Sequence, residues 1–290
     1  ISGSLAYDRI MDFPGRFADH ILPEKIHVLN VCFNINGLKE KFGGTAGNIA
    51  YTLALLEERP DIVATAGADF ARYEQWLHQN RLSTRWIKKI PEVLTAGAYI
   101  TTDLDDNQIT AFNPGAMAYD ADLPQLGTTK KETVVLIAPG NKRDMMAFAA
   151  RARDARVPYF FDPGQSLNTW ERDEIREAAG GALCFISNDY ELSQFLQLTE
   201  WSMKTLYEKV EVVITTLGPD GVMLDLGGER LLIPAAPVSE VLDPTGAGDA
   251  FRAGLLKGWS MGIGWDICCQ MGAVTATYAI EQYGTQEHYL

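Results

Sequence analysis

Short apolar runs alternate with amphipathic stretches along most of the chain. The runs are apolar throughout rather than at every second position, which is typical of strands that are buried on both faces of a sheet. They predict strands at residues 62–66, 133–138, 158–161, 182–187, 211–215 and 221–225. The amphipathic stretches predict helices at residues 49–54, 73–78, 144–155, 172–178, 190–196, 248–259 and 265–283. Strands separated by helices predict an α/β fold with a mostly parallel sheet covered on both faces.

Two segments break this pattern. Residues 26–34, and residues 96–102 together with 108–112, look like half-buried strands without a following helix. The Asn, Asp and Gly residues between them favour antiparallel pairing. We expect these segments to form a small second sheet beside the main one; edge strands of the main sheet are the alternative.

Charge and length narrow the range of functions. The chain has 290 residues, with 25 basic and 38 acidic side chains and a formal net charge of −13. This length fits one large α/β domain or a main domain with a smaller attachment. An acidic surface repels phosphate backbones and anionic lipids, so we expect neither nucleic-acid nor membrane-surface binding. No apolar run is long enough to cross a bilayer.

The compartment is predicted from the first residues and the cysteines. The start of the chain lacks the basic segment and the long apolar segment of a signal peptide. Four cysteines in a chain of this length are too few for a disulfide scaffold, and none forms a C-x-x-C pair. We therefore expect a cytoplasmic protein with reduced cysteines in or near its core. These cysteines are Cys32, Cys184, Cys268 and Cys269.

The most informative motif is Asp243-Pro244-Thr245-Gly246-Ala247-Gly248-Asp249, which opens an apolar helix. Its small residues allow a ligand to approach the backbone, and the amides of a helix start bind anions. Asp249 is then either a helix cap or a general base that acts on a hydroxyl group. The chain has no G-x-x-x-x-G-K-[ST] motif, and Phe251 stands where a dinucleotide fingerprint needs its third glycine. Any phosphate-binding site in this chain therefore belongs to a class other than these two.

Four further positions carry candidate chemistry. Gly43-Gly44 leads into a helical run in which Asn48 is either a cap or a polar ligand-binding side chain. Asp8 is predicted at the carboxyl end of a strand, the edge at which open α/β sheets bind ligands. Asn188 and Glu191 lie one turn apart after another strand, where they form either a capping box or a site for hydrated Mg²⁺. The fourth position, from Thr215 to Gly221, reads on its own as a turn between two strands.

Taken together and in this order, these motifs resemble the ribokinase-like (PfkB) family of carbohydrate and nucleoside kinases. The likeness covers residues 1–290 as a single domain. It implies a three-layer αβα sandwich with a mostly parallel sheet and a small β lid from about 9–40 and 92–115. The resemblance also allows a homodimer through the lid, although the sequence leaves the oligomeric state open.

The resemblance implies a role for each motif. Asp8 and Asn48 bind sugar hydroxyls, and Gly43-Gly44 lets the sugar approach the backbone. Asp249 takes the proton from the acceptor hydroxyl, while amides at Gly246, Ala247 and Gly248 stabilise charge on the transferring phosphoryl group. On the ATP side, the implied residues are Asn188, Thr216, Gly218 and Gly221, and Asn188 and Glu191 hold Mg²⁺ through water. A requirement for a monovalent cation such as K⁺ stays open.

Within the family, the chain looks most similar to bacterial adenosine and nucleoside kinases. The likeness rests on residues 3–8, 101–103, 108–117, 162–165 and 284–287. It implies an ATP-dependent kinase for the 5′-hydroxyl of a ribonucleoside, adenosine before inosine or guanosine. Phe33 and Phe112 are expected either to stack on the base or to pack within the lid, and Gln165 to reach the base or the ribose. A kinase for free ribose or fructose, and a non-catalytic sensor with a kinase fold, are the alternatives.

Overall fold

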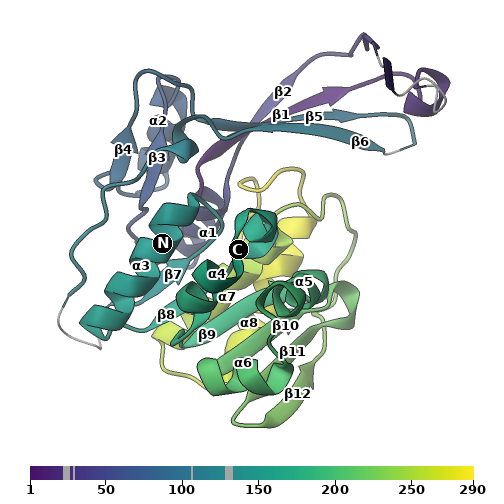
Figure 1. The fold of residues 1–290 in the computed structure, drawn as a ribbon. Coiled ribbons are helices and arrows are strands. Elements are labelled where there is room, and N and C mark those ends of the chain that lie inside the picture. Colours follow the sequence, from purple (N-terminus) through teal and green to yellow (C-terminus); the bar gives the residue numbers. More distant parts are fainter. Residues whose placement is uncertain (22–26, 29, 106, 128–132) are drawn as a thin grey trace.

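The computed structural model describes residues 1–21, 27–28, 30–105, 107–127 and 133–290 (Figure 1). Its strands are β1 (Ala6–Asp12), β2 (Lys39–Gly43), β3 (Ala64–Ala66), β4 (Ile87–Lys89), β5 (Ala96–Thr102), β6 (Gln108–Asn113), β7 (Val135–Ile137), β8 (Tyr159–Phe161), β9 (Cys184–Asn188), β10 (Val212–Thr216), β11 (Val222–Leu226) and β12 (Glu229–Ile233). Its α-helices are α1 (Thr45–Leu55), α2 (Ala71–Gln79), α3 (Lys142–Ala155), α4 (Arg172–Ala179), α5 (Asp189–Thr199), α6 (Met203–Lys209), α7 (Ala247–Ser260) and α8 (Trp265–Ile280).

The main sheet is mostly parallel, as the apolar runs predict. Six strands follow the order β12-β11-β10-β9-β8-β7, with β7 to β10 parallel and β11 and β12 antiparallel. The start of the chain extends this sheet, because Ser2 pairs with Ile137 on one side and Val63 on the other. Beyond Val63, β3 pairs with β4 in parallel. The predicted strands therefore form, with small shifts of their ends.

Both faces of the main sheet are buried, which accounts for its continuous apolar runs. Tyr159 and Phe161 pack in one core with residues of α3, α4, α5 and α6. Phe160, between them, packs on the other face with residues of α1, α7 and α8. Adjacent residues of a strand point to opposite faces, so a strand between two helix layers needs an apolar residue at every position. The result is the three-layer α/β arrangement that the resemblance implies.

The second sheet has four strands in the order β2-β1-β5-β6, and Figure 1 shows it extending away from the main sheet. We call this sheet the lid. Strands β5 and β6 pair antiparallel as predicted, whereas β1 and β5 are parallel. The chain passes from Ser2 in the main sheet to Ala6 in the lid within four residues. This short connection keeps the base of the lid close to the carboxyl edge of the main sheet.

Several expectations from the sequence are wrong. Residues 27–28 are a 3₁₀ turn and residues 30–34 have no regular structure, while Ile26 and Leu29 lie outside the described residues, so the predicted strand at 26–34 does not form there. The lid takes its other two strands from β1 and β2, which carry charged residues on both faces. A strand ending at Asp8 was expected, but its continuation to Asp12 and strand β2 were not. Helix α8 ends at Ile280 rather than at residue 283. Cys184, Cys268 and Cys269 are buried as expected, but Cys32 is exposed.

Candidate active site

The loop before α7 brings its small residues to the first turn of that helix. Gly246 precedes the helix with a φ of 82°, a left-handed conformation that glycine adopts without strain. Asp243 holds the loop, since its carboxylate accepts hydrogen bonds from the amides of Thr245 (2.9 Å) and Gly284 (3.0 Å). The first amides of a helix have no partner within the helix and favour an anion. Asp249 lies in this first turn, so its carboxylate stands beside an anion-binding position.

Asn48 and Asp249 lie far apart in the sequence but touch in the structure. The Asn48 Nδ2 amide donates a 2.8 Å hydrogen bond to Asp249 Oδ2. Asn48 is in the first turns of α1, which packs against α7. Its Oδ1 accepts from Gln286 Nε2 (3.0 Å) and lies 2.8 Å from Thr285 Oγ1. Side chains from α1, α7 and the C-terminal segment therefore meet at one point.

Asp8 faces the same region from the lid. It is the third residue of β1, inside a strand of the lid sheet, so its expected place at the carboxyl end of a main-sheet strand is wrong. A Cβ atom at Gly43 would collide with the Asp8 carboxylate, and Gly44 has a φ of 87°. Glycine at both positions therefore gives Asp8 its space and starts α1. Burial raises the pKa of Asp8 to about 6, and the nearby Asp249 and Asp243 carboxylates add to the rise.

The charge on Asp249 is balanced by a buried arginine. Arg252 forms an ion pair with Asp162 through its Nε, and its Nη1 lies 3.9 Å from Asp249 Oδ1. Burial raises the pKa of Asp249 above its usual range, whereas Arg252 and the hydrogen bond from Asn48 act to lower it. Burial likewise raises the pKa of Asp162 to about 7, against the effect of Arg252. The site thus holds several carboxylates around one guanidinium group.

Replacing Asp8 by Asn is expected to stabilise the protein at neutral pH. Asp8 has a folded pKa of about 6, above the usual 3.8, so folding disfavours its charged form. Wild type therefore loses stability as pH rises from about 4 to about 6, a loss of at most about 3 kcal/mol that Asp8→Asn does not share. Urea unfolding of both proteins at pH 5 and pH 7.5 measures this. Equal stability differences at the two pH values would contradict the prediction.

The predicted nucleotide-side residues lie together at the carboxyl ends of neighbouring strands. Asn188 at the end of β9 pairs in register with Thr216 at the end of β10. Asn188 Oδ1 accepts a hydrogen bond from the backbone N–H of Glu191 (2.7 Å), and Glu191 Oε2 accepts one from the backbone N–H of Asn188 (2.9 Å). This is the capping box that the sequence left open. Gly218 and Gly221 form the turn after β10, with φ values of 57° and 97°.

The capping box leaves one carboxylate oxygen of Glu191 available to a metal ion. It uses one oxygen of each side chain, and Glu191 Oε1 takes no part in it. Glu191 also lies close enough to Asp162 and Asp249 to raise the pKa of both. An oxygen ligand beside the site fits the preference of hydrated Mg²⁺.

The aromatic residues assigned to a base differ in their surroundings. Phe112 on β6 is half exposed and lies in one cross-strand row with Asp8 and Ala98, so it points to the same face of the lid as Asp8. Phe33 packs against Phe13 and Phe17, with ring centroids 4.7 and 5.1 Å apart, as lid packing predicts. Gln165, in the 3₁₀ turn η4 (Gly164–Thr169) after β8, is exposed. Contact of Phe33 or Gln165 with a ligand stays a prediction.

Sequence reasoning missed four residues of this site. It assigned no role to Arg252, which lies beside Asp249, or to Asp162, which pairs with Arg252. It also assigned none to Gln286, which donates to Asn48, or to Trp76, which donates to Gln286. Arg252 follows Asp249 by three residues, so helical spacing could have suggested their contact. Asp162, Gln286 and Trp76 come from distant segments. Residues 162–165 and 284–287 were part of the resemblance, but nothing in the local sequence predicts which residues Asp162, Gln286 and Trp76 contact.

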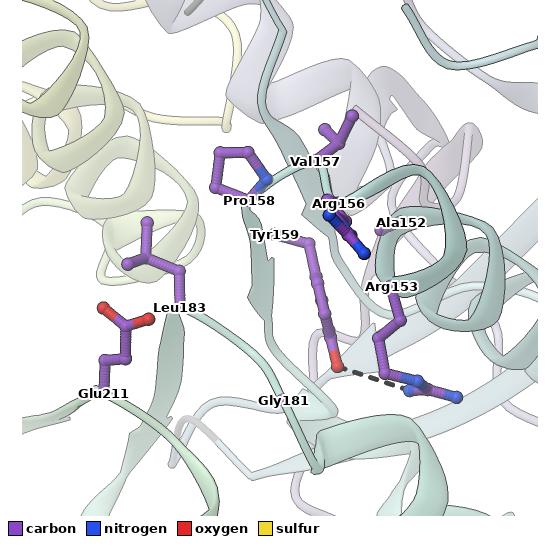
Figure 2. Close-up of a pocket in the computed structure, with 9 residues that line it drawn as sticks. All are labelled: Ala152, Arg153, Arg156, Val157, Pro158, Tyr159, Gly181, Leu183 and Glu211. Carbon is purple, nitrogen blue, oxygen red and sulfur yellow. Dashed lines mark hydrogen bonds between the residues drawn. The ribbon is translucent and has the colours of Figure 1, made fainter. Parts of the chain in front are cut away.

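Two hollows among the described residues lie elsewhere. Figure 2 shows one of about 440 Å³ at the amino ends of β8 and β9, lined by Tyr159, Gly181 and Leu183 among others. Its Arg153 is engaged with the protein itself, with Nη1 2.7 Å from the Glu177 carbonyl and 3.4 Å from the Tyr159 hydroxyl. Asn188 and Thr216 lie at the carboxyl ends of main-sheet strands, the edge at which open α/β sheets bind ligands, and Asp162 directly follows β8. This makes the carboxyl edge the candidate site.

Within the described residues, no helix is long and apolar enough to cross a membrane.

Comparison with known proteins agrees with the architecture. A nucleoside kinase from Methanocaldococcus jannaschii is 29% identical over 267 residues, which span 91% of this chain and 87% of that protein. The crystal structure of the M. jannaschii nucleoside kinase covers 99% of this chain and 93% of its own, with a TM-score of 0.89 and 28% identity. The Burkholderia thailandensis nucleoside kinase in complex with inosine has a TM-score of 0.84 and 35% identity, covering 99% of this chain and 92% of its own.

The pfkB family carbohydrate kinase pattern matches residues 16–289, nearly the whole chain. This match confirms the resemblance and the fold class expected from the motifs. The chain belongs to the pfkB family of carbohydrate kinases and is a phosphotransferase.

Proposed function

We propose that the chain is an ATP-dependent kinase for the 5′-hydroxyl of a ribonucleoside, with adenosine as the first candidate among the purine nucleosides. The observation that carries this proposal is the position of Asp249. Its carboxylate lies in the first turn of α7, is held by Asn48 and is balanced by Arg252. A base beside an anion-binding helix start suits the transfer of a phosphoryl group to an alcohol.

In the proposed reaction, Asp249 accepts the proton of the 5′-hydroxyl while that oxygen bonds to the γ-phosphorus of ATP. The bond between the γ-phosphorus and the bridging oxygen breaks, and ADP leaves with the electron pair. The amides at Gly246, Ala247 and Gly248 face the transferring group. Of these, the Ala247 amide also donates a long 3.3 Å hydrogen bond to the Pro244 carbonyl. Asp8 and Asn48 orient the ribose, and such positioning supplies much of the rate of phosphoryl transfer.

For the metal, we propose Glu191 and Asn188 as residues that hold Mg²⁺ through water. Bound Mg²⁺ neutralises charge on the phosphate oxygens during transfer. Glu191 Oε1 is the candidate acceptor for a metal-bound water, since Glu191 Oε2 accepts from the Asn188 amide. Thr216, Gly218 and Gly221 are proposed to contact the nucleotide. Thr216 ends β10 directly beside Asn188, and the two glycines lie in the turn that follows.

The choice of a nucleoside over a free sugar is supported by two observations. The similar proteins from M. jannaschii and B. thailandensis are nucleoside kinases, and the second has inosine bound. On this chain, Phe112 offers a half-exposed ring on the face of the lid that carries Asp8. A ring at this position suits a purine that lies beyond a ribose held by Asp8.

Replacing Phe112 by Ala is expected to raise the KM for adenosine about tenfold, because base–aromatic stacking contributes about 1–3 kcal/mol. The KM for ribose should change little in the same variant. Ile109→Ala is the matched control, since Ile109 lies on the same strand with similar exposure (43% against 50%) but points to the opposite face. Equal losses for Phe112→Ala and Ile109→Ala would contradict a role in base binding.

The identity of the product tests the function itself. Incubation with ATP, Mg²⁺ and adenosine should give ADP and adenosine 5′-monophosphate, which phosphorus NMR distinguishes from the 2′- and 3′-phosphates. A phosphate at another position of the ribose would overturn the assignment of the 5′-hydroxyl.

A further inference from the structure

A series of three hydrogen bonds, the middle one buried, leads from α2 to Asp249. Trp76 Nε1 donates to Gln286 Oε1 (2.9 Å), and Gln286 Nε2 donates to Asn48 Oδ1 (3.0 Å). Asn48 Nδ2 then donates to Asp249 Oδ2 (2.8 Å). Gln286 is only 2% exposed and Asn48 only 5%, so water cannot easily replace these partners. These hydrogen bonds connect α2, the C-terminal segment, α1 and α7.

The direction of this chain is fixed at its start. An indole N–H can only donate, so Trp76 must face the oxygen of the Gln286 amide, and the Gln286 nitrogen must face Asn48. A second group gives the same direction. Tyr73 donates its proton to the Gly43 carbonyl (2.8 Å), which leaves its oxygen as an acceptor for Gln286 Nε2 (2.6 Å). Both amide protons of Gln286 are thus directed, one to Tyr73 and one to Asn48.

The shape of the Asn48 amide gives it no direction of its own, because its two ends are nearly alike. Its partners set the direction: the Asp249 carboxylate accepts at one end and Gln286 donates at the other. Reversed, the amide would place its oxygen against the Asp249 carboxylate and its nitrogen against the donating nitrogen of Gln286. Thr285 does not decide the matter, since its single hydroxyl proton is shared between the Phe42 carbonyl (3.0 Å) and Asn48 Oδ1 (2.8 Å).

We propose that Gln286, itself oriented by Trp76, is a positioning residue that turns the nitrogen of the Asn48 amide toward Asp249. The inference rests on the proposed function, in which Asn48 binds the ribose and Asp249 is the base. Neither Gln286 nor Trp76 needs to touch the substrate in this role. Their effect is to keep a hydrogen-bond donor on the carboxylate that must stay ionised before it takes a proton.

The consequence is a defined change in pH dependence. The charged groups around Asp249 are Arg252 on its own helix, Glu191 on α5, Asp162 after β8 and Asp8 on β1. They stay in place when Gln286 is changed. Loss of the Asn48 donor alone makes the Asp249 carboxylate easier to protonate. The acidic limb of the rate profile should therefore move to higher pH.

The test uses Gln286→Met, which keeps the length of the side chain and removes its donor. The expected result is a fall in kcat of about tenfold near neutral pH, the order of one hydrogen bond to a charged group, with the acidic limb moved upward. Trp76→Phe tests the same chain from its other end and should move the acidic limb in the same direction. Tyr51→Phe is the control, because it removes the 2.9 Å hydrogen bond from Tyr51 to the His288 carbonyl and leaves Asn48 untouched.

A second measurement does not depend on turnover. In wild type, the side-chain ¹⁵N–¹H resonances of Asn48, assigned by their loss in Asn48→Asp, should shift as Asp249 titrates. In Gln286→Met this response should weaken, because the Gln286 donor no longer holds the oxygen end of the Asn48 amide and the reversed orientation becomes less unfavourable.

An unchanged Asn48 response in Gln286→Met overturns the inference, as does a shift of the acidic limb that is equally large in Tyr51→Phe. Failure of the proposed function is recognised separately, by wild-type turnover in Asp249→Asn.

Discussion

Asp249→Asn is expected to lower the rate of phosphoryl transfer by about 10²- to 10⁴-fold, the usual contribution of a positioned general base. The amide oxygen of the new side chain can still accept the hydrogen bond that Asn48 Nδ2 now gives to Asp249 Oδ2. It cannot take a proton from the acceptor hydroxyl. Substrate affinity should therefore stay near the wild-type value while kcat falls, which steady-state kinetics and calorimetric titration measure together.

A matched control for this change is Asp266→Asn. Asp266 lies in the first turn of α8 and is exposed, so the same substitution removes a helix-start charge away from the site. Its kcat should equal that of wild type. Comparable losses in the two variants would show that the effect comes from helix stability rather than from the base.

Arg252→Met is expected to have the second-largest effect, on stability as well as on activity. The Arg252 side chain is 12% exposed and pairs with Asp162, whose side chain is fully buried. Removing one partner of a buried ion pair costs about 3–5 kcal/mol, because the other charge is left without compensation. Arg252 also lowers the pKa of Asp249, so its loss should move the acidic limb of the rate profile to higher pH. Urea unfolding and a pH–rate profile measure the two effects.

Two further variants separate these effects. Arg72→Met removes a surface ion pair with Glu40 and should change stability by less than about 1 kcal/mol. The double variant Arg252→Met with Asp162→Asn should recover part of the stability, since it leaves no buried carboxylate unpaired. It should keep the altered pH profile, because Asp249 still lacks its cation. A double variant as unstable as Arg252→Met would contradict the ion-pair account.

The main sheet was predictable because its strands are buried on both faces. Phe160 and Phe161 must both be apolar because helices cover each face of the sheet, so consecutive positions of the strand are apolar. The lid was harder to predict. Strand β2 has the sequence Lys39-Glu40-Lys41-Phe42-Gly43. A small sheet with exposed faces tolerates charged residues, so the apolar pattern that would predict this strand is weak.

The residues of the candidate site likewise fall into a predictable group and a group that the sequence does not predict. Asp249 and Gly246 belong to a continuous motif whose backbone demands are local, so the sequence predicts their position at a helix start. Asp8 was predicted for the site but placed on the wrong sheet, because the four residues that connect it to the main sheet carry no signal for the change. Gln286 acts through contacts with residues more than two hundred positions away, which only the folded chain brings together.

The measurement that tests the central claim most directly is ATP consumption with Mg²⁺ against adenosine, inosine, guanosine, cytidine, ribose and fructose, in wild type and in Asp249→Asn. The account predicts turnover on purine nucleosides that is lost in the variant. Turnover on ribose or fructose alone would contradict the assignment of a nucleoside and remove the role given to Phe112. Turnover that survives in Asp249→Asn would contradict the assignment of the base.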